Sequence, residues 1–165
     1  VQNSKNEADP KAYLAQQGLT AWNKGVAIYI QMMAAAQDQG ELVNGWHLWA
    51  RLHIIEREFT KALSSDESWN SIKLGLGFNA YTRDQAEVIT NADFMLIAIS
   101  HASGLDFSDF FEMWALGAST DAKSTVADFN FDKVTESFYL FNDDQFCQSL
   151  AESKVAVDGA QIWPY

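Results

Sequence analysis

The chain has 165 residues, 48% of them hydrophobic and 13% aromatic, and its 22 acidic against 11 basic side chains give a formal net charge of −11. This length and apolar content suit one domain with a sizeable core, and they exclude disorder over most of the chain. The acidity disfavours binding to nucleic acids and to anionic membranes, and the sequence lacks the run of about 18 apolar residues that a membrane span requires.

The N-terminal part of the chain begins with a polar segment, residues 1–8, that we expect to be loose. Residues 9–165 are expected to form a single helical domain. Asp9-Pro10 is typical of a helix cap followed by the first helical position, which predicts a short helix. Thr20 is a candidate cap of a second helix, whose predicted apolar face consists of Trp22, Val26, Tyr29, Ile30 and Met33.

The longest helix is predicted to follow Asn44, because apolar side chains recur there at helical spacing. Its predicted buried stripe consists of Leu48, Leu52, Ile55, Phe59 and Leu63. Two shorter helices should follow, one capped by the turn Ser64-Ser65-Asp66 and one starting at Thr82. Gly75 and Gly77 indicate a loop between them.

Residues 91–117 predict two helices joined by a tight loop, with a very aromatic seam between them. Asn91 is the predicted cap of the first helix, and Gly104 is its predicted end. The apolar face of this helix consists of Phe94, Ile97, Ala98 and His101. Asp106 is the predicted cap of the second helix, whose stripe consists of Phe107, Phe110, Phe111 and Trp114.

The C-terminal part changes in character. Ser119 is a candidate cap of a short helix, and residues 136–141 are aromatic and prone to form a strand. Asp158-Gly159, between apolar runs, is typical of a hairpin turn. We therefore expect a mostly α fold, a multi-helix, bundle-like domain with a small C-terminal β-hairpin element.

One weak metal-binding pattern lies on the long predicted helix. His53 and Glu56 are three positions apart and could supply two ligands, although such a pair is more often an ordinary surface contact. His47 and His53 lie about 120° apart around a helix and cannot readily hold one ion together. A zinc site on this helix would therefore need ligands from elsewhere.

A second weak pattern is Asp128, Asn130 and Asp132, which match the opening of a calcium-binding loop. The loop next requires glycine, where this chain has Lys133, and it ends with glutamate, where this chain has Tyr139. The alternating phenylalanines fit a strand or a turn equally well.

Among side chains that could serve catalysis, His101 and Tyr81 are candidate donors of a hydrogen bond to a substrate carbonyl oxygen. For His101 the alternative is a mostly buried ring bonded to a backbone carbonyl. Cys147 is the only cysteine, which excludes an internal disulfide. The sequence contains no serine-nucleophile elbow, P-loop or dinucleotide-binding motif.

Trp46, Trp49 and Asp106 are candidates for lining a substrate cleft. The six tryptophans of the chain could form a platform on which sugar rings stack. Most of them lie on predicted helical stripes, however, which favours core packing.

A set of residues in the aromatic helix pair resembles a pattern from secreted zinc metallopeptidases of the enhancin-like, mucin- and glycoprotein-targeting group, including the immunomodulating metalloprotease type: Ser100, Gly104, Leu105, Phe110, Phe111 and Trp114. In that group a helix ending in Ser and Gly precedes a Phe-Phe-x-x-Trp helix, downstream of the zinc site. The segment Gly45-Trp46-His47-Leu48-Trp49 resembles the helix that lies between the zinc motif and this pair. The resemblance extends from Asn44 to Gly117.

The HExxH zinc motif of these enzymes and their downstream Glu ligand have no match in this chain. The resemblance therefore implies a non-catalytic, C-terminal helical portion of a larger secreted, cell-surface or periplasmic bacterial peptidase. No cofactor is expected in this chain, and zinc is expected in the parent protein. The implied partners are the zinc-bearing upstream half and a protein or glycoprotein substrate, and His101 or Tyr81 would donate to the oxyanion.

The start at Val1 and the unpaired Cys147 also favour a piece of a larger protein. The alternative function is a non-enzymatic helical adhesion module that binds a glycan or a protein. A helical interaction domain without a small ligand is a third hypothesis.

Overall fold

The computed structural model describes residues 22–135, 137–140 and 153–156. Helices dominate this part of the chain, which confirms the mostly α prediction. They are α3 (Trp22–Asp38), α4 (Trp46–Ala62), α5 (Asp66–Ile72), α6 (Arg83–Glu87), α7 (Asn91–Ser103), α8 (Ser108–Met113) and α9 (Thr120–Ala127). The predicted loose N-terminus, the helix after Asp9-Pro10, Cys147 and the turn at Asp158-Gly159 lie outside the described residues. No described helix combines the length and apolarity needed to cross a bilayer.

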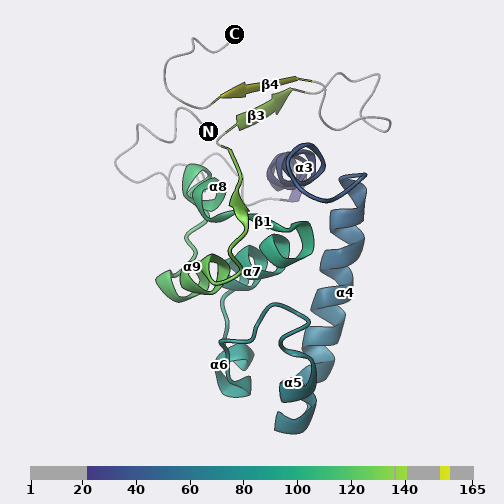
Figure 1. Ribbon diagram of the computed structural model, residues 1–165, viewed down its shortest axis with the longest axis vertical. Coiled ribbons are helices and arrows are strands. Elements are labelled where there is room, and N and C mark those ends of the chain that lie inside the picture. The colour runs from purple at the N-terminus through teal and green to yellow at the C-terminus, as the bar shows by residue number, and fades with distance from the viewer. Residues whose placement is uncertain (1–21, 136, 141–152, 157–165) are drawn as a thin grey trace.

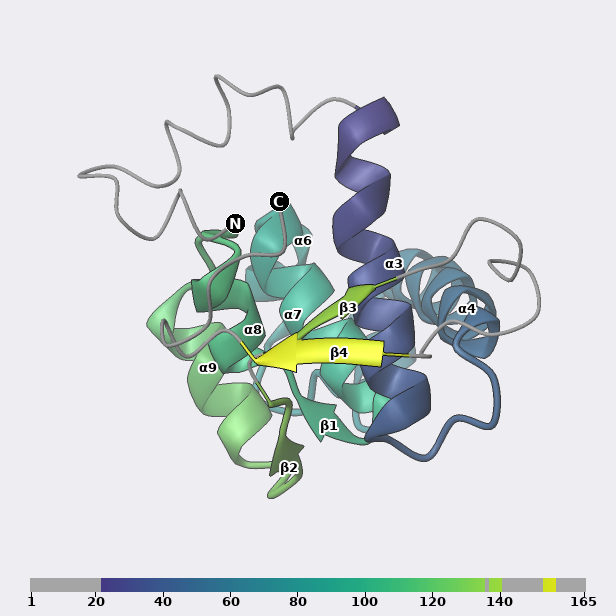
Figure 2. The same cartoon turned by 90° about the horizontal axis from the view of Figure 1, so that it is seen from above.

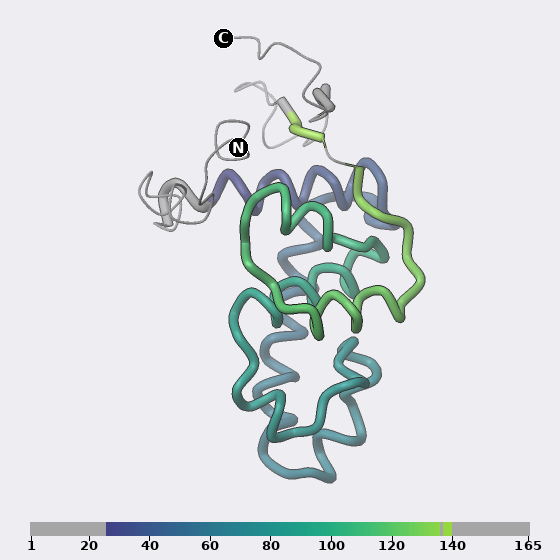
Figure 3. Tube along the Cα trace, turned by 90° about the vertical axis from the view of Figure 1, so that its left-hand side faces the viewer, coloured from purple at the N-terminus to yellow at the C-terminus, as the bar shows by residue number. Residues whose placement is uncertain are grey.

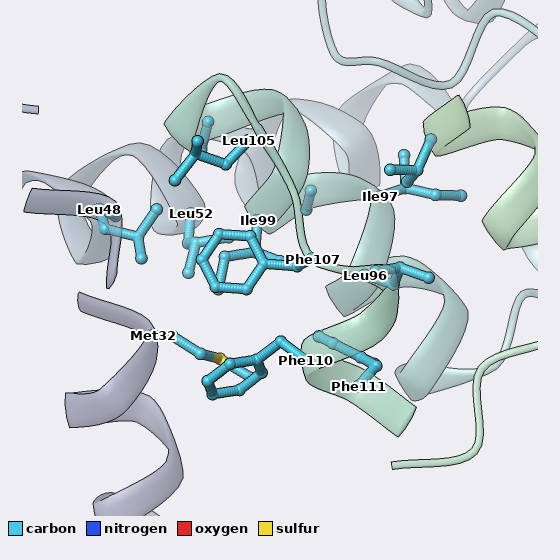
Figure 4. Close-up of a cluster of buried hydrophobic side chains, with 14 of the residues drawn as sticks. Met32, Leu48, Leu52, Leu96, Ile97, Ile99, Leu105, Phe107, Phe110 and Phe111 are labelled. Atoms are coloured by element: carbon cyan, nitrogen blue, oxygen red, sulfur yellow. The ribbon is translucent and has the colours of Figure 1, made fainter. Parts of the chain in front are cut away.

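Helix α7 lies at the centre of the fold, with α4 on one side and α9 on another (Figure 1). Because both sides are covered, α7 is buried around most of its circumference and not on a single face. Its fully buried side chains include Leu96, Ile97, Ala98, Ile99 and Ser100. Figure 4 shows how Met32 of α3, Leu48 and Leu52 of α4 and the phenylalanines of α8 meet these residues in one core.

Helix α4 runs along one edge of the molecule, from the level of α3 down to α5 (Figure 1). It is amphipathic as predicted, because Leu48, Leu52, Ile55 and Phe59 are buried. The last predicted member of the stripe, Leu63, is the half-buried C-cap, and Ala62 is buried instead. The predicted aromatic stripe is also confirmed, since Phe107, Phe110, Phe111 and Trp114 are each at most 2% exposed. Spacing along a helix was sufficient to identify both faces.

Among the side-chain caps predicted within the described residues, those at Ser65, Thr82 and Ser119 are confirmed, and those at Asn91 and Asp106 are the two exceptions. The side chains of Ser65, Thr82 and Ser119 each accept a hydrogen bond from a first-turn amide, and Thr82 forms a reciprocal capping box with Gln85. The prediction for Asn91 was wrong by one residue. Thr90 has the extended backbone that a cap requires, and its hydroxyl accepts from the Asp93 amide at 3.1 Å, so Asn91 is already helical.

The second exception is Asp106. The cap position of α8 belongs to Phe107, which makes no capping hydrogen bond with its side chain. The Asp106 carboxylate nevertheless accepts from the Ser108 amide at 2.8 Å, so it still satisfies the first amide of the helix. Gly104, with φ +73°, ends α7 in the left-handed conformation as predicted.

The strands form two small pairs. β3 (Ser137–Leu140) pairs antiparallel with β4 (Ser153–Ala156), with Ser137 opposite Ala156 and Leu140 opposite Ser153. This confirms the strand predicted over residues 136–141. β1 (Leu105–Asp106) pairs in parallel with β2 (Asp132–Lys133), a contact that no local pattern predicted.

The β3–β4 pair lies across α3, as the view from above shows (Figure 2). Gln31 of α3 is 3% exposed, and its side-chain amide forms two hydrogen bonds with the backbone of Tyr139 in β3. Its Nε2 donates to the Tyr139 carbonyl at 2.8 Å, and its Oε1 accepts from the Tyr139 amide at 2.7 Å. On this side of β3, the Gln31 side chain therefore makes the two backbone hydrogen bonds that a neighbouring strand would otherwise make. Figure 3 shows this end of the molecule opposite the end formed by α5 and α6.

Candidate functional site

A polar cavity of about 230 Å³ lies between the start of α6 and the helix α9. Its lining combines one aromatic ring with hydroxyl, amide and carboxylate groups, and consists of Ala80, Tyr81, Gln85, Asp121, Ser124, Thr125 and Asp128. Tyr81 is the only one of the sequence-predicted oxyanion donors in it. Such a mixed lining can bind a ligand through several hydrogen bonds.

The backbone carbonyl and the ring of Tyr81 are held in place by contacts with three neighbouring side chains. Its backbone carbonyl accepts from Trp69 Nε1 at 2.9 Å and from Lys73 Nζ at 3.2 Å. Its ring packs against Phe78 with a centroid separation of 6.0 Å. Burial, followed by the negative charges of Asp93 and Asp121, raises the pKa of the Tyr81 hydroxyl, and a hydrogen bond with Thr125 opposes this. A tyrosine hydroxyl is protonated at neutral pH even without such a rise. Because the Thr125 hydroxyl donates its own proton to the Asp121 carbonyl, Tyr81 is the donor in its bond with Thr125.

His101, the other predicted donor, lies in the last turn of α7. Its Nε2 is 2.9 Å from the Gly75 carbonyl, so this nitrogen carries a proton and donates it to the backbone. The imidazole also lies 5.7 Å from the Phe129 ring, measured between centroids. The structure thus shows the hydrogen bond to a backbone carbonyl that the sequence offered as the alternative for this residue, and it does not place His101 in the cavity with Tyr81.

Gly77 lies in the loop against which His101 packs, and we predict that a larger residue at this position destabilises the chain. Its φ is +87°, and a Cβ atom added there would lie 2.9 Å from Cβ and Cγ of His101. Gly77→Ala should therefore lower the free energy of unfolding by about 2 kcal/mol through backbone strain and this contact. Urea denaturation followed by circular dichroism measures the change.

Gly75→Ala is the matched control for this prediction, because its added Cβ would approach nothing closer than the Ile72 carbonyl at 3.5 Å. We expect it to change stability by no more than about 0.5 kcal/mol. Equal effects of the two substitutions would contradict the role assigned to Gly77.

The predicted cleft residues of α4 are distributed over its outer and inner surfaces. Trp46 is 41% exposed. Trp49 is half-buried between Tyr29, at a centroid separation of 5.0 Å, and His53, at 5.6 Å. His53 and Glu56 approach to 3.5 Å with side chains 72% and 65% exposed, which is a solvent-exposed surface pair. Neither tryptophan lies in the cavity beside Tyr81.

Asp106, the third predicted cleft residue, is 6% exposed. Its carboxylate binds the Ser108 amide, and its backbone carbonyl accepts from the Val134 amide at 2.9 Å. The carbonyl bond holds the loop between α7 and α8 against the residue that follows β2, and the carboxylate bond joins this loop to the first residue of α8. The role of Asp106 is therefore structural, because its bonds fix the turn that leads into α8.

The calcium-like residues occupy three different conformations. Asp128 is at the C-terminal cap of α9, Asn130 has a left-handed φ of +54°, and Asp132 is in β2. Across the described part of the chain, no three His, Cys, Asp or Glu side chains lie together in a way that could hold a metal ion. The residues present here therefore do not fit the zinc that the resemblance implies, and no step through zinc is assigned to them.

Sequence reasoning missed three of the polar residues that surround Tyr81, Asp121, Ser124 and Thr125, and it named Asp128 only as part of a calcium-loop pattern. Asp121, Ser124, Thr125 and Asp128 follow the i, i+3, i+4, i+7 spacing of one helical face. A polar stripe of this kind normally faces solvent, and only the packing of residues 80–85 against it makes a cavity. The available signal was the stripe itself, without any indication of what lies opposite.

The fold is that of a part of larger metallopeptidases. The chain matches the structure described as IMPa metallopeptidase in complex with T-antigen with a TM-score of 0.71 at 24% identity, over 98% of this chain and 19% of that one. It matches IMPa metallopeptidase from Pseudomonas aeruginosa with a TM-score of 0.69 at 24% identity, over 99% and 20%. A third match, to IMPa from Pseudomonas aeruginosa in complex with an O-glycopeptide, has a TM-score of 0.71 at 24% identity, over 98% and 19%.

The structural matches confirm, at the level of fold, the resemblance found in residues 44–117, and they extend it to nearly the whole chain. The chain spans about a fifth of the length of the IMPa structures that it matches. Neither a protein-family model nor a curated protein sequence matches it.

Proposed function

We propose that this chain is the non-catalytic, C-terminal helical portion of a secreted zinc-dependent peptidase that cleaves mucins or other glycoproteins, and that it forms one wall of the substrate cleft. The single observation that supports this most strongly is the match of nearly the whole chain to one-fifth of the IMPa metallopeptidase at a TM-score of 0.71. The missing HExxH motif agrees with a reactive centre that lies on residues outside this chain.

Within this wall, the cavity beside Tyr81 is the part proposed to meet the substrate. Several of its groups are exposed and chemically varied, whereas Asp106 is engaged in its own loop and His101 donates to Gly75, away from this cavity. Of the two predicted donors, Tyr81 therefore has the stronger case for binding substrate. The contribution of such a wall to catalysis is to position the substrate.

The proposed function is tested by comparing this chain with its full-length parent on an O-glycopeptide, with cleavage followed by mass spectrometry. We expect cleavage by the parent that a chelator abolishes and zinc restores, and none by the isolated chain. Metal-dependent cleavage by the isolated chain would overturn the assignment. A parent without peptidase activity, combined with a chain that captures intact glycoprotein, would favour the alternative of an adhesion module.

The position in the cleft wall needs its own measurement. A photo-crosslinking amino acid in place of Ser124, which is exposed and lines the cavity, should capture glycopeptide in a parent whose catalytic glutamate is replaced. The same amino acid at Ser71, an exposed position on α5 outside the cavity, should not. Equal capture at both positions argues against a wall at this place.

A further inference from the structure

We infer that the outer face of α4 is the surface on which the rest of the parent polypeptide docks. This outer face consists of Trp46, Ala50 and Ile54 of α4, together with Val43 of the loop before the helix. The inference rests on the proposed function for the existence of a larger polypeptide, and it adds the place of contact.

Helix α4 has apolar side chains on two opposite sides. It lies at the edge of the molecule, and among the described elements it packs mainly against α3, α5 and α7 (Figure 1). Trp46, Ala50 and Ile54 recur at every fourth position on the side away from its buried stripe, and all three are exposed. Because a helix with one face in the core normally has polar residues on the other, the outer face is a second surface to be covered.

The exposed apolar side chains of the described part are concentrated at this face. Five large hydrophobic residues are exposed there, and three of them belong to the outer face: Val43 at 91%, Trp46 at 41% and Ile54 at 48%. The other two are Leu74, in the loop after α5, and Val88, at the end of α6, and they do not form a helical stripe. Single exposed hydrophobic residues are common on protein surfaces, whereas a contiguous stripe indicates a contact.

The charge of α4 indicates the chemistry of the surface that covers it. The helix has three basic side chains, Arg51, Arg57 and Lys61, against two acidic ones, Glu56 and Glu58. It is the only described helix with an excess of basic side chains, in a chain whose formal net charge is −11. A partner surface with an apolar centre and an acidic rim therefore complements this face.

One border of the outer face is ordered before any contact forms. The His53 ring, three positions after Ala50, stacks on Trp49 at a centroid separation of 5.6 Å and an interplanar angle of 18°. Trp49 in turn contacts the Tyr29 ring of α3 at 5.0 Å. Side chains that are already held in place lose little conformational entropy on docking, which favours a contact here.

The size of the face favours a covalently connected partner over a second copy of this chain. Seventeen residues of α4 make a helix about 25 Å long, and a face about 10 Å wide gives a few hundred Å². A stable interface between separate proteins buries about 800 Å² of each partner. A contact within one polypeptide can be smaller, because the connection raises the effective concentration of the two parts. The chain spans about a fifth of the IMPa structures, so the remainder of the parent is the occupant that we assign.

The test compares hydroxyl-radical footprinting of the 165-residue chain and of the full-length parent, with oxidation of each side chain measured by mass spectrometry. We expect Val43 and Ile54 to be oxidised at least about fivefold more slowly in the parent, because docking reduces their exposure to that of core residues. Leu74 and Val88 are the matched controls, since both are exposed in the chain, and their oxidation should be the same in the two proteins.

A substitution tests the contact within the parent alone, so that the result does not depend on how the isolated chain folds. Ala50→Trp places an indole where a packed contact has no space for it, and should raise the oxidation of Ile54 in the parent by about fivefold. Ser71→Trp adds the same side chain at an exposed position on α5 and should leave Ile54 protected.

Three outcomes would overturn the docking face: equal oxidation of Ile54 in the chain and the parent, equal protection of Leu74 and Val88, or no effect of Ala50→Trp in the parent. Sedimentation velocity addresses the other occupant. We expect the isolated chain to be a monomer, and a dimer that Ala50→Trp abolishes would assign the face to a second copy instead.

The docking face and the proposed function can fail separately. A parent that cleaves O-glycopeptide but oxidises Ile54 as fast as the isolated chain refutes the docking face and leaves the peptidase assignment intact. A parent that protects Val43 and Ile54 but cleaves nothing supports the docking face and refutes the peptidase assignment.

Discussion

Replacing Phe59 with alanine should lower the free energy of unfolding by about 3–5 kcal/mol. Phe59 is 6% exposed, and its ring centroid lies 5.2 Å from that of Trp69, 4.8 Å from that of Phe78 and 5.0 Å from that of Phe94. The substitution would leave a cavity where α4, α5, the loop after α5 and α7 meet, and it would remove three aromatic contacts at once. Urea denaturation monitored by tryptophan fluorescence would report the loss.

Two control variants separate the cavity from a general effect on α4. Phe59→Leu keeps most of the buried volume and should cost about 1–2 kcal/mol. Ile54→Ala truncates a residue of the same helix that is 48% exposed, and should cost no more than about 0.5 kcal/mol. If Ile54→Ala destabilised the chain as much as Phe59→Ala, the aromatic cluster would not be the centre of stability at this end.

Replacing Gln31 with leucine should have the second largest effect, a loss of about 2–5 kcal/mol. Leucine has nearly the same size but no polar atoms, so it leaves both the amide and the carbonyl of Tyr139 buried without a partner. Each such group costs about 1–3 kcal/mol. The expected result is that β3 detaches from α3 before the helices unfold, seen as faster hydrogen exchange of the Tyr139 amide.

Gln37→Leu is the matched control, because Gln37 is on the same helix but is partly exposed, and among the described residues it accepts one hydrogen bond, from the Gly45 amide at 2.9 Å. It should cost about 1 kcal/mol and leave exchange at Tyr139 unchanged. Unaltered exchange in Gln31→Leu would mean that β3 is held by other contacts, such as the hydrogen bond from the Tyr139 hydroxyl to Asp38 at 2.9 Å.

The candidate site could be predicted only in part. Tyr81 was recognised as a possible donor because it lies in a glycine-flanked loop, and it does line a cavity. Asp121 was not recognised, and Asp128, the C-cap residue of α9, was considered only as a calcium ligand, since a polar helical stripe gives no information about its partner. His101 and Trp49 were harder to assign, because an aromatic or imidazole side chain on a helical face suits a core and a ligand site equally well.

The sequence by itself determined the described helices, most of their ends and the buried faces of α4 and α8, whereas α3 buries Ile28, Gln31 and Met32, outside its predicted face, and α7 is buried on more than its predicted face. The stripe of α4, the aromatic stripe of α8, the caps at Ser65 and Ser119 and the break at Gly104 depend on residues within one or two turns of each other, so local spacing contains the whole signal. The one-residue error at Asn91 belongs to the same level, because Thr90 and Asn91 are both good caps and only the backbone conformation distinguishes them.

Only the tertiary structure decided how distant segments meet. Gln31 is 108 residues from Tyr139, residues 80–85 are brought to α9, and β1 pairs with β2 across the intervening helices. Hydrogen bonds and cavities of this kind are set by the packing of the whole core around α7. The spacing of their polar residues, even where it forms a helical stripe as on α9, does not identify the partner, because the partner is close in space and distant along the chain.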